Sequence, residues 1–541
     1  MTLPVLMEKL LRREWACVGL ILLLALALRL CNLDATTLWI DEIYSLMVAN
    51  VHVTPHHLPA QVMTGGDFYR QYLAWQPMNW PALLEALKIN VHMPLYYLLL
   101  NPWLGAFGNN AIGLRSFSAV CSTLMLIPVY WLGKALGGGQ RAGLLSMLVA
   151  ALVPFQLYYG QEGRMYALSL FWAAWTGLAF WKTLYAKRPL PWSLLYAVCV
   201  SGGLLSHYMF VFFLGFQALY AGLWLLKNRN KKRFLYLGFA LIAVIGIACW
   251  WAPVYQIQQQ GVNDEYHFAK GLMDWSRYAT AVIWQPLIVV AGDNPWERVF
   301  YLPFTVLLFL LYLFKPGNSA AKNSSFQREG FLLCWIFTPL LLQIGYDFLK
   351  HTHTSVIDRY AMLISPAMCL WVGLSLDYLI KRRPWLANSK HLLANMISKL
   401  LNPALILPIM GLLAVALVAY PSPFRDEHNK DKDIRGKFQW MTHQARPTDL
   451  VFVNGPWGAA LTAGYYLRRQ HPEQPMFYWI NQHQGQAVPL PAPSLLSAYQ
   501  RVWLFRYRAN NERGLQQAKE YLQSQFPRMT RTHDWFIYER H

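Results

Sequence analysis

The chain has 541 residues, of which 55% are hydrophobic and only 14% are charged. Soluble domains carry about 25% charged residues, so this composition excludes an ordinary soluble globule as well as a disordered chain. A mean hydropathy of +0.24 instead predicts a protein with about ten membrane-spanning helices and an additional soluble part.

The net charge of +20 would suggest a nucleic-acid partner in a soluble protein. In a membrane protein, short cytoplasmic loops collect lysine and arginine, so we expect membrane lipid and no nucleic acid as the partner of these charges. The seven cysteines all fall in or beside apolar runs. They are expected to be small core residues, not disulfides or zinc ligands.

Apolar runs predict a polytopic α-helical membrane protein with about 11 transmembrane helices, within a range of about 11–13. The runs cover residues 16–31, 114–136, 141–157, 165–184, 192–205, 207–226, 234–254, 299–315, 330–349, 360–380 and 401–420. The stretch 192–226 would measure about 52 Å as one helix, which is too long for one crossing. We therefore expect two helices there, with a turn at Ser206 and His207.

The distribution of charge predicts which loops face the cytoplasm. With the N-terminus inside, the cytoplasmic segments hold 21 lysines and arginines, whereas the external residues 34–113 hold only Arg70 and Lys88. A crossing at 93–108 would reverse every later loop, so we expect an interfacial or re-entrant helix at that place. Residues 255–298 form a second external loop in this topology.

The C-terminal residues 421–541 follow the transmembrane part, residues 1–420, and have a different pattern. Residues 449–454, 476–480 and 501–506 have the pattern of strands, and residues 459–469 and 511–525 that of helices. This alternation predicts a soluble α/β domain outside the membrane, on the same side as the two external loops.

Two adjacent carboxylates, Asp41 and Glu42, lie between apolar residues just after the first apolar run. Adjacent positions do not face the same way on a helix or a strand. We expect one carboxylate to point into a site and the other to support the fold. The alternative is that both are interfacial acids that cap a short helix.

Four further polar clusters occur at the outer ends of predicted helices. They are His92 to Tyr97, Gln161 to Leu168, Ser206 to Tyr208 and Asp358 to Tyr360. Each cluster alone is typical of interfacial anchoring, because tyrosine favours the headgroup level and arginine extends toward it. The predicted topology places all of them on the membrane face that carries Asp41. Carboxylates, arginines and tyrosines gathered there suit a substrate with an anionic headgroup and an apolar tail.

The order of the motifs WIDEIYS, HMPLYY, LRSFSAV, QEGRMYAL, SHY and DRYAMLISPA resembles the GT-C integral membrane glycosyltransferases. The resemblance is to the family 39 protein O-mannosyltransferase group and its bacterial relatives, which include the lipid A aminoarabinose transferases. Met93 and Gly163 depart from the family pattern without removing a polar group. The tryptophan-rich residues 60–87 have no counterpart that we can align.

This resemblance implies that residues 1–420 are a GT-C catalytic domain. Such enzymes transfer a sugar from a polyprenyl-phosphate donor to a lipid, glycan or protein acceptor at the outer membrane face, with inversion at the anomeric carbon. Asp41 would be the general base, and Arg359 and Arg164 would bind the donor phosphate. The further residues expected to bind or orient donor or acceptor are Glu42, His92, Tyr96, Glu162, Tyr360 and His207. The implied location is the bacterial inner (plasma) membrane, with a cytoplasmic N-terminus and a periplasmic active site and C-terminal domain.

No cofactor is required by this chemistry, although a divalent metal could bridge a phosphate to Asp41. The paired histidines are weak metal candidates: His56, His57, His351 and His353. Two other functions are open at this point, a flippase or transporter of polyprenyl-linked lipid and a ligase or polymerase of lipid-linked oligosaccharides. The carboxylates in an external loop, away from the bilayer midplane, argue against the transporter.

Overall fold

The computed structural model describes most of the chain. The described residues are 3–53, 61–228, 231–265, 275–291, 299, 301–303, 305–309, 322–387, 403–419, 434–455, 457–479, 490–506, 512–532 and 535–540. The chain folds into two compact units. The first comprises Met1–Leu33, Arg115–Ala252 and Phe268–Pro421, and the second comprises Asp34–Leu114, Pro253–His267 and Ser422–His541.

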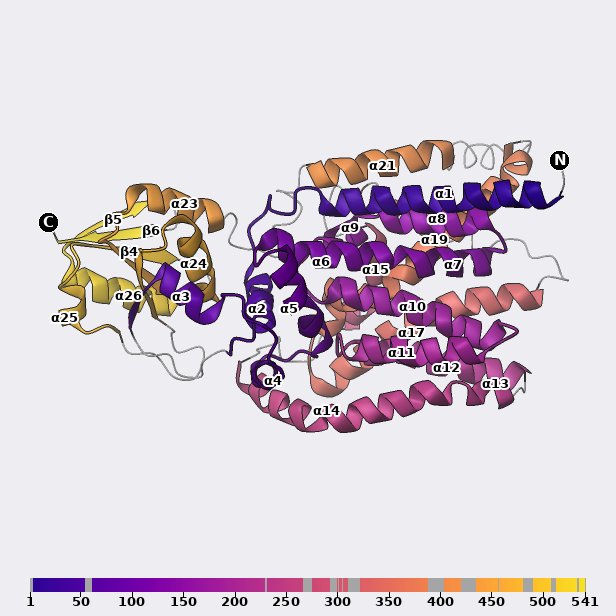
Figure 1. Ribbon diagram of the computed structural model, residues 1–541, viewed down its shortest axis with the longest axis horizontal. Coiled ribbons are helices and arrows are strands. Elements are labelled where there is room, and N and C mark those ends of the chain that lie inside the picture. The colour runs from indigo at the N-terminus through magenta and orange to yellow at the C-terminus, as the bar shows by residue number, and fades with distance from the viewer. Residues whose placement is uncertain are drawn as a thin grey trace. The chain divides into compact units, whose positions relative to one another are not determined.

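The first unit is a bundle of helices (Figure 1). Its main helices are α1 (Leu3–Leu30), α6 (Ala111–Leu124), α7 (Leu126–Gly137), α8 (Gln140–Leu152), α9 (Pro154–Gly160), α10 (Tyr166–Tyr185), α11 (Leu190–Leu204), α12 (Phe210–Asn228), α13 (Lys231–Leu235), α14 (Gly238–Glu265), α15 (Trp275–Ala291), α17 (Lys322–Lys350), α18 (Asp358–Ala361), α19 (Ser365–Ala387) and α21 (Pro403–Ala419). Helix α6 begins, and helix α14 ends, in the second unit.

Small residues let the central helices of this bundle approach closely. Helix α8 packs against α7 and α19, α10 against α11, and α12 against α17. A Cβ atom at Gly373 would lie 2.4 Å from the Cα atom of Ser146, and one at Gly143 would lie 2.7 Å from the carbonyl oxygen of Tyr130. Such contacts are typical of helix pairs in membranes, where close packing replaces the hydrophobic effect.

Within the described residues, five helical stretches are long and apolar enough to cross a membrane, or six when a pair bent by 61° counts as one span. The five are Ala111–Gly137, Phe210–Asn228, Lys232–Gln260, Gln327–Lys350 and Asp358–Lys381, and the bent pair is Gln140–Leu152 with Pro154–Gly160. Helices α1, α10, α11 and α21 also occupy predicted spans. The predicted span 299–315 is described only at 299, 301–303 and 305–309, so the total of eleven crossings stays a prediction.

Three local expectations can be compared directly with the structure. The stretch 192–226 contains two helices, α11 and α12, separated near Ser206 and His207 as predicted. The stretch 93–108 contains α5 (Leu95–Phe107), whose 13 residues span about 20 Å, less than a bilayer core. The predicted external loop 255–298 contains helix α15, which packs against α9, α17 and α19 of the first unit. This helix was not predicted from the sequence, because Arg277 and the central Pro286 interrupt its apolar pattern.

The second unit contains a six-stranded mixed sheet with strand order β1-β3-β2-β4-β6-β5. The strands are β1 (Val62–Thr64), β2 (Leu450–Asn454), β3 (Pro475–Trp479), β4 (Arg501–Arg506), β5 (Arg528–Thr532) and β6 (Trp535–Glu539). The central strand β2 is parallel to β3 and β4, and the other pairs are antiparallel. Phe452, Phe477 and Leu504 of the parallel strands form a buried core with Leu522 of α26 (Glu512–Gln525).

Further helices complete this unit. They are α2 (Ile40–Ala49), α3 (Gly65–Tyr72), α4 (Trp80–Ile89), α5, α23 (Ile434–Gln444), α24 (Trp457–Gln470) and α25 (Pro493–Leu496). Helix α24 packs against α2, α3 and α23. The predicted strands at 449–454, 476–480 and 501–506 lie within one residue of β2, β3 and β4, whereas β5, β6 and α23 were not predicted. The sheet also takes β1 from the N-terminal loop, so its residues are not confined to 421–541.

Candidate functional site

Asp41 and Glu42 occupy the first turn of helix α2, where their environments differ. Glu42 is 1% exposed, and its carboxylate accepts a hydrogen bond from the backbone N–H of Trp39 at 3.3 Å. This contact is one half of a capping box and stabilises the start of the helix. Asp41 is only partly buried. The helix therefore gives the two adjacent carboxylates different environments: Glu42 is a buried capping group, and Asp41 is more accessible.

His92 and Tyr96 lie at the start of helix α5, in the same unit. The side chain of Gln258, fully buried in α14, donates hydrogen bonds to the backbone carbonyls of Leu87, Asn90 and His92 at 2.6, 3.2 and 3.2 Å. These bonds hold the turn that presents His92. Tyr96 is fully buried next to Tyr97, with ring centroids 5.2 Å apart. Gln258 is therefore a supporting residue, and it was not identified from the sequence.

In the first unit, Glu162 and Arg164 lie in the connection between α9 and α10. Gln161 anchors this connection by donating hydrogen bonds to the carbonyls of Leu28, Arg29 and Cys31 at the end of α1. Glu162 and Arg164 are 6% and 4% exposed. The segment is thus a buried turn that carries two opposite charges.

His207 lies between helices α11 and α12 in the same unit. Its ring centroid is 6.0 Å from that of Tyr166 and 6.2 Å from that of Tyr360. Burial and the charges of Arg164 and Arg359 lower the pKa of His207 to about 3. Its Nδ1 atom accepts a hydrogen bond from the backbone N–H of Met209 at 3.1 Å. The imidazole is therefore neutral, and its proton is on Nε2, which is a donor.

Arg359 follows a loop that is held by one buried aspartate. The carboxylate of Asp347, at the end of α17, accepts hydrogen bonds from the hydroxyls of Thr352 and Thr354 and from the backbone N–H groups of Thr354 and Ser355 at 2.6–2.9 Å. The chain then enters α18 with Asp358 and Arg359. This network fixes the approach to the helix that carries Arg359.

Two glutamines hold the residues on either side of Arg359, and one aromatic ring lies near its guanidinium. Gln285 of α15 donates a hydrogen bond to the carboxylate of Asp358 at 3.0 Å, and Gln343 of α17 donates one to the carbonyl of Tyr360 at 2.8 Å. The Arg359 guanidinium lies 5.4 Å from the centre of the Tyr360 ring. Gln285, Gln343 and Asp347 were not found from the sequence. The sequence feature that could have identified them is a single polar side chain within an apolar helix.

The structure thus brings Arg164, His207, Arg359 and Tyr360 together from three separate connections of the first unit. The two arginines lie within electrostatic reach of His207. Tyr159, next to Tyr166, lies within electrostatic reach of the carboxylates of Glu162 and Asp358. Two cations, two carboxylates, a neutral imidazole and several phenols are thus gathered in one place. Arginine forks bind phosphate oxygens in pairs, so this arrangement has the chemistry of a phosphate site.

Arg29 is a further buried cation of the first unit, and it was not identified from the sequence. It is fully buried at the end of α1, and its partners among the described residues are the Ser122 hydroxyl and three backbone carbonyls. These partners are neutral oxygens, so the four hydrogen bonds do not cancel its charge. A Cβ atom at Gly160, next to Gln161, would lie 3.1 Å from the Arg29 Nε atom. An ionised group buried at membrane depth is a functional candidate because it is costly to place there.

The histidines considered as metal ligands do not form a cluster in the part of the chain that the structure describes. His351 is exposed and His353 is partly buried. No group of three or more His, Cys, Asp or Glu side chains suited to a metal ion occurs among the described residues. His56 and His57 lie outside them.

Comparisons with known proteins agree with the motifs. Residues 91–252 match the family model described as dolichyl-phosphate-mannose-protein mannosyltransferase. An undecaprenyl phosphate-alpha-4-amino-4-deoxy-L-arabinose arabinosyl transferase of Pseudomonas aeruginosa is 29% identical over 367 residues, 65% of this chain and 58% of that protein. The corresponding transferase 1 of Pseudomonas fluorescens is 24% identical over 245 residues, 43% of this chain and 41% of that protein. The matched regions therefore span about half the length of these relatives.

Solved structures show the same fold along the whole chain. The crystal structure of ArnT from Cupriavidus metallidurans in the apo state aligns with a TM-score of 0.57, covering 99% of this chain and 98% of that chain at 12% identity. The structure of the same protein bound to undecaprenyl phosphate aligns with a TM-score of 0.56, covering 98% of both chains at 12% identity. The chain therefore has the fold of a polytopic membrane glycosyltransferase, and the predicted resemblance to the GT-C glycosyltransferases is confirmed.

Proposed function

We propose that the protein is an inverting glycosyltransferase that moves a sugar from a polyprenyl-phosphate donor to an acceptor at the outer face of the membrane. The observation that carries this proposal is the cluster of Arg164, Arg359 and neutral His207. A phosphate that bridges a lipid and a sugar would find two guanidinium groups and an Nε2–H donor there. The relatives named as undecaprenyl-phosphate-sugar transferases support the same donor class.

In the proposed step, the acceptor hydroxyl or amine attacks the anomeric carbon as the bond from that carbon to the phosphate oxygen breaks. The electron pair of the broken bond leaves with the polyprenyl phosphate, and the acceptor proton passes to the carboxylate of Asp41. A single displacement inverts the anomeric centre. Arg164 and Arg359 stabilise the negative charge that develops on the phosphate. We write this step without a metal ion, because a lipid phosphate can leave without one.

Asp41 is assigned the role of base because Glu42 is already engaged at the start of its helix. Glu42 is buried and accepts the Trp39 N–H, whereas Asp41 is partly exposed one residue earlier. His92 and Tyr96 are proposed to orient acceptor or donor from the start of α5. Glu162 and Tyr360 are proposed to do so from the connections that carry the arginines.

The names of the relatives suggest the first donor to test. Both are described as acting with undecaprenyl phosphate-alpha-4-amino-4-deoxy-L-arabinose. We propose that the donor of this protein is of the same class, an undecaprenyl-phosphate monosaccharide, and that the acceptor is a lipid. The matching family model is described as a protein mannosyltransferase. A protein is therefore the second acceptor to be tested, for comparison with the lipid.

The charge distribution supports an orientation with the N-terminus in the cytoplasm of a bacterial plasma membrane. Asp41 and the C-terminal segment, the soluble α/β part of the protein, would then face the periplasm. Reporter fusions after Arg233 and after Arg383 should report a cytoplasmic position, and a fusion at the C-terminus should report a periplasmic one. A cytoplasmic C-terminus would contradict this orientation.

The function is tested with purified protein in proteoliposomes. Undecaprenyl phosphate-linked 4-amino-4-deoxy-L-arabinose, labelled in the sugar, is supplied with a lipid A-type glycolipid or with an envelope protein fraction. We expect free undecaprenyl phosphate and labelled glycolipid from wild type, and neither product from Asp41→Asn. Movement of intact donor across the bilayer without bond cleavage would identify a flippase and overturn the proposal. Transfer of preassembled oligosaccharides alone would identify a ligase.

A further inference from the structure

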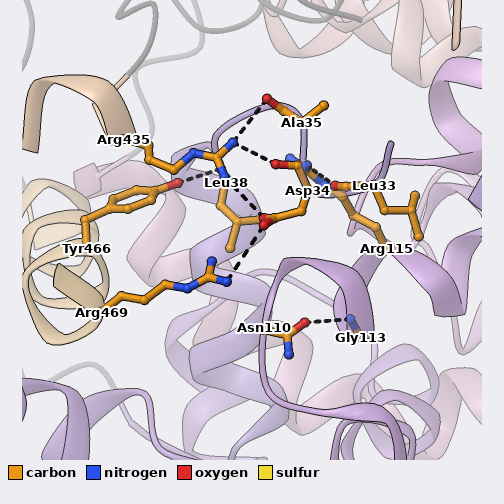
Figure 2. A network of polar contacts seen from close by, with 10 residues as sticks. All are labelled: Leu33, Asp34, Ala35, Leu38, Asn110, Gly113, Arg115, Arg435, Tyr466 and Arg469. Carbon is orange, nitrogen blue, oxygen red and sulfur yellow. Dashed lines mark hydrogen bonds and ion pairs between the residues drawn. The ribbon is translucent and has the colours of Figure 1, made fainter. Parts of the chain in front are cut away.

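The connection between the first span and the Asp41 helix is attached to the C-terminal part of the second unit. Asp34 opens this connection, and its carboxylate lies 3.5 Å from Arg435 of α23 and 3.8 Å from Arg469 of α24. Arg435 also donates hydrogen bonds to the backbone carbonyls of Asp34 and Ala35 at 2.7 and 3.1 Å. Figure 2 shows these arginines and Tyr466 reaching the connection from the C-terminal helices.

Tyr466 holds the backbone just before helix α2. Its hydroxyl accepts a hydrogen bond from the backbone N–H of Leu38 at 2.8 Å, three residues before Asp41. Tyr466 is 2% exposed, and its ring stacks at 19° on that of Phe438 in α23. The Tyr466 hydroxyl is therefore held in place by the packing of α23 against α24. The position of these two helices in turn sets the position of the Leu38 backbone.

The first residue of α2 fits against a glycine of α24. A Cβ atom at Gly458 would lie 1.9 Å from the Cδ1 atom of Ile40 and 2.3 Å from its Cγ1 atom. Only glycine leaves room for Ile40 in this position. Because Ile40 directly precedes Asp41, a shift of the Ile40 backbone would also move the proposed base.

The opposite end of α2 is held by different residues. Asn101 of α5 donates a hydrogen bond to the carbonyl of Ala49 at 2.8 Å, and Asn50 donates one to the carbonyl of Leu73 at 2.9 Å. All of these partners belong to the N-terminal loop itself. The loop therefore fixes the end of α2 that is remote from Asp41, whereas the C-terminal helices fix the end that carries it.

We propose that Tyr466, Arg435 and Gly458 are positioning residues that set the location of the Asp41 carboxylate. The C-terminal helices are then an integral part of the catalytic apparatus and not a separable accessory. This inference rests on the proposed function, because it assigns these residues a role through the general base. A displacement of about 1 Å at a reacting group can lower a rate about 100-fold, so small changes in this attachment are measurable.

The first test compares two neighbouring tyrosines of α24. Tyr466→Phe removes the acceptor of the Leu38 N–H, whereas Tyr465→Phe removes a buried hydroxyl that has no hydrogen-bond partner among the described residues. We expect Tyr466→Phe to lower the single-turnover transfer rate by about tenfold without changing donor affinity. Tyr465→Phe should transfer at the wild-type rate. Equal rates in the two variants would overturn the inference.

The second test uses compensation between Gly458 and Ile40. Gly458→Ala should lower the transfer rate, and adding Ile40→Ala, which removes both clashing atoms, should restore most of it. The matched control is Gly464→Ala in the same helix, where the new Cβ atom would lie 2.2 Å from the Phe68 ring of α3. This control should lower thermal stability without a selective fall in the rate of the folded fraction. A double variant no faster than Gly458→Ala would contradict the inference.

Asp41→Asn is measured beside these variants so that two failures can be told apart. If Asp41→Asn retains transfer, Asp41 is not the base and the proposed function fails at this residue. If Asp41→Asn is inactive while the folded Tyr466→Phe and Gly458→Ala proteins react at the wild-type rate, only the positioning inference fails. Rescue in the Gly458 and Ile40 pair, together with a slow Tyr466→Phe, supports both.

Discussion

Glu42 accepts a hydrogen bond at 3.3 Å from the backbone N–H of Trp39, the residue that precedes helix α2. This contact gives the two adjacent carboxylates of the helix separate roles. Glu42 is buried and its charge stabilises the helix start, where the dipole favours an anion. Asp41 remains partly exposed.

This difference predicts opposite results for two amide substitutions. Asp41→Asn keeps the shape of the side chain but removes the proton acceptor, so single-turnover transfer should fall at least about 100-fold. Glu42→Gln retains an acceptor oxygen for the Trp39 N–H, so its rate should stay within about tenfold of wild type, with a modest loss of thermal stability. Donor binding should be unchanged in both variants. A fast Asp41→Asn protein with a slow Glu42→Gln protein would mean that the roles are reversed.

The residues of the candidate site could be found from the sequence because polar groups in apolar surroundings stand out. Asp41, Arg164, His207 and Arg359 were each identified in this way, and the structure places the last three near one another. Their proximity could not be derived from the sequence. It depends on how three connections meet at one end of a helix bundle.

The supporting residues were missed for a related reason. Gln258, Gln285 and Asp347 lie inside or at the end of long helices, where a single polar residue resembles an ordinary surface position. The contribution of β1 to the sheet was missed as well, since a strand of three residues shows no alternation. Long-range pairings such as β1 with β3 join segments about 400 positions apart, which no local pattern encodes.

His207 gives a prediction about pH. Its folded pKa of about 3 lies below the 6.5 of an unfolded chain, so the unfolded chain takes up the proton first as pH falls. The stability that neutral His207 contributes is complete above about pH 6.5 and is lost as pH falls toward about 3. The thermal midpoint of wild type should therefore fall more between pH 7 and pH 5 than that of His207→Gln, measured by scanning fluorimetry in detergent. Equal falls in the two proteins would contradict a buried neutral imidazole.

Arg359 is predicted to bind the donor phosphate through its planar guanidinium. Arg359→Lys keeps the charge but loses the paired hydrogen bonds, so the donor KM should rise about tenfold or more while the protein still inserts into the membrane. Arg188→Lys, at an exposed position between α10 and α11, is the matched control and should leave the KM unchanged. An unchanged donor KM in Arg359→Lys would show that this arginine only anchors the helix at the interface.

Asp347 is predicted to act on the donor site through the loop that leads to Arg359. In Asp347→Ala, the backbone N–H groups of Thr354 and Ser355 lose their acceptor, and each buried unsatisfied donor costs about 1–3 kcal/mol. We expect a lower thermal midpoint and a raised donor KM, with the rate at saturating donor close to that of wild type.

The control for Asp347→Ala is Asp377→Ala, which removes another buried aspartate of the first unit. Asp377 pairs with Arg141 and Lys381 at 2.6 and 2.5 Å, and none of these residues belongs to the segment that leads to Arg359. It should lower the thermal midpoint without raising the donor KM. Equal donor KM values in the two variants would mean that the Asp347 network supports the fold alone. A rise confined to Asp347→Ala would show that the loop sets the position of Arg359, because general loss of stability is shared by both variants.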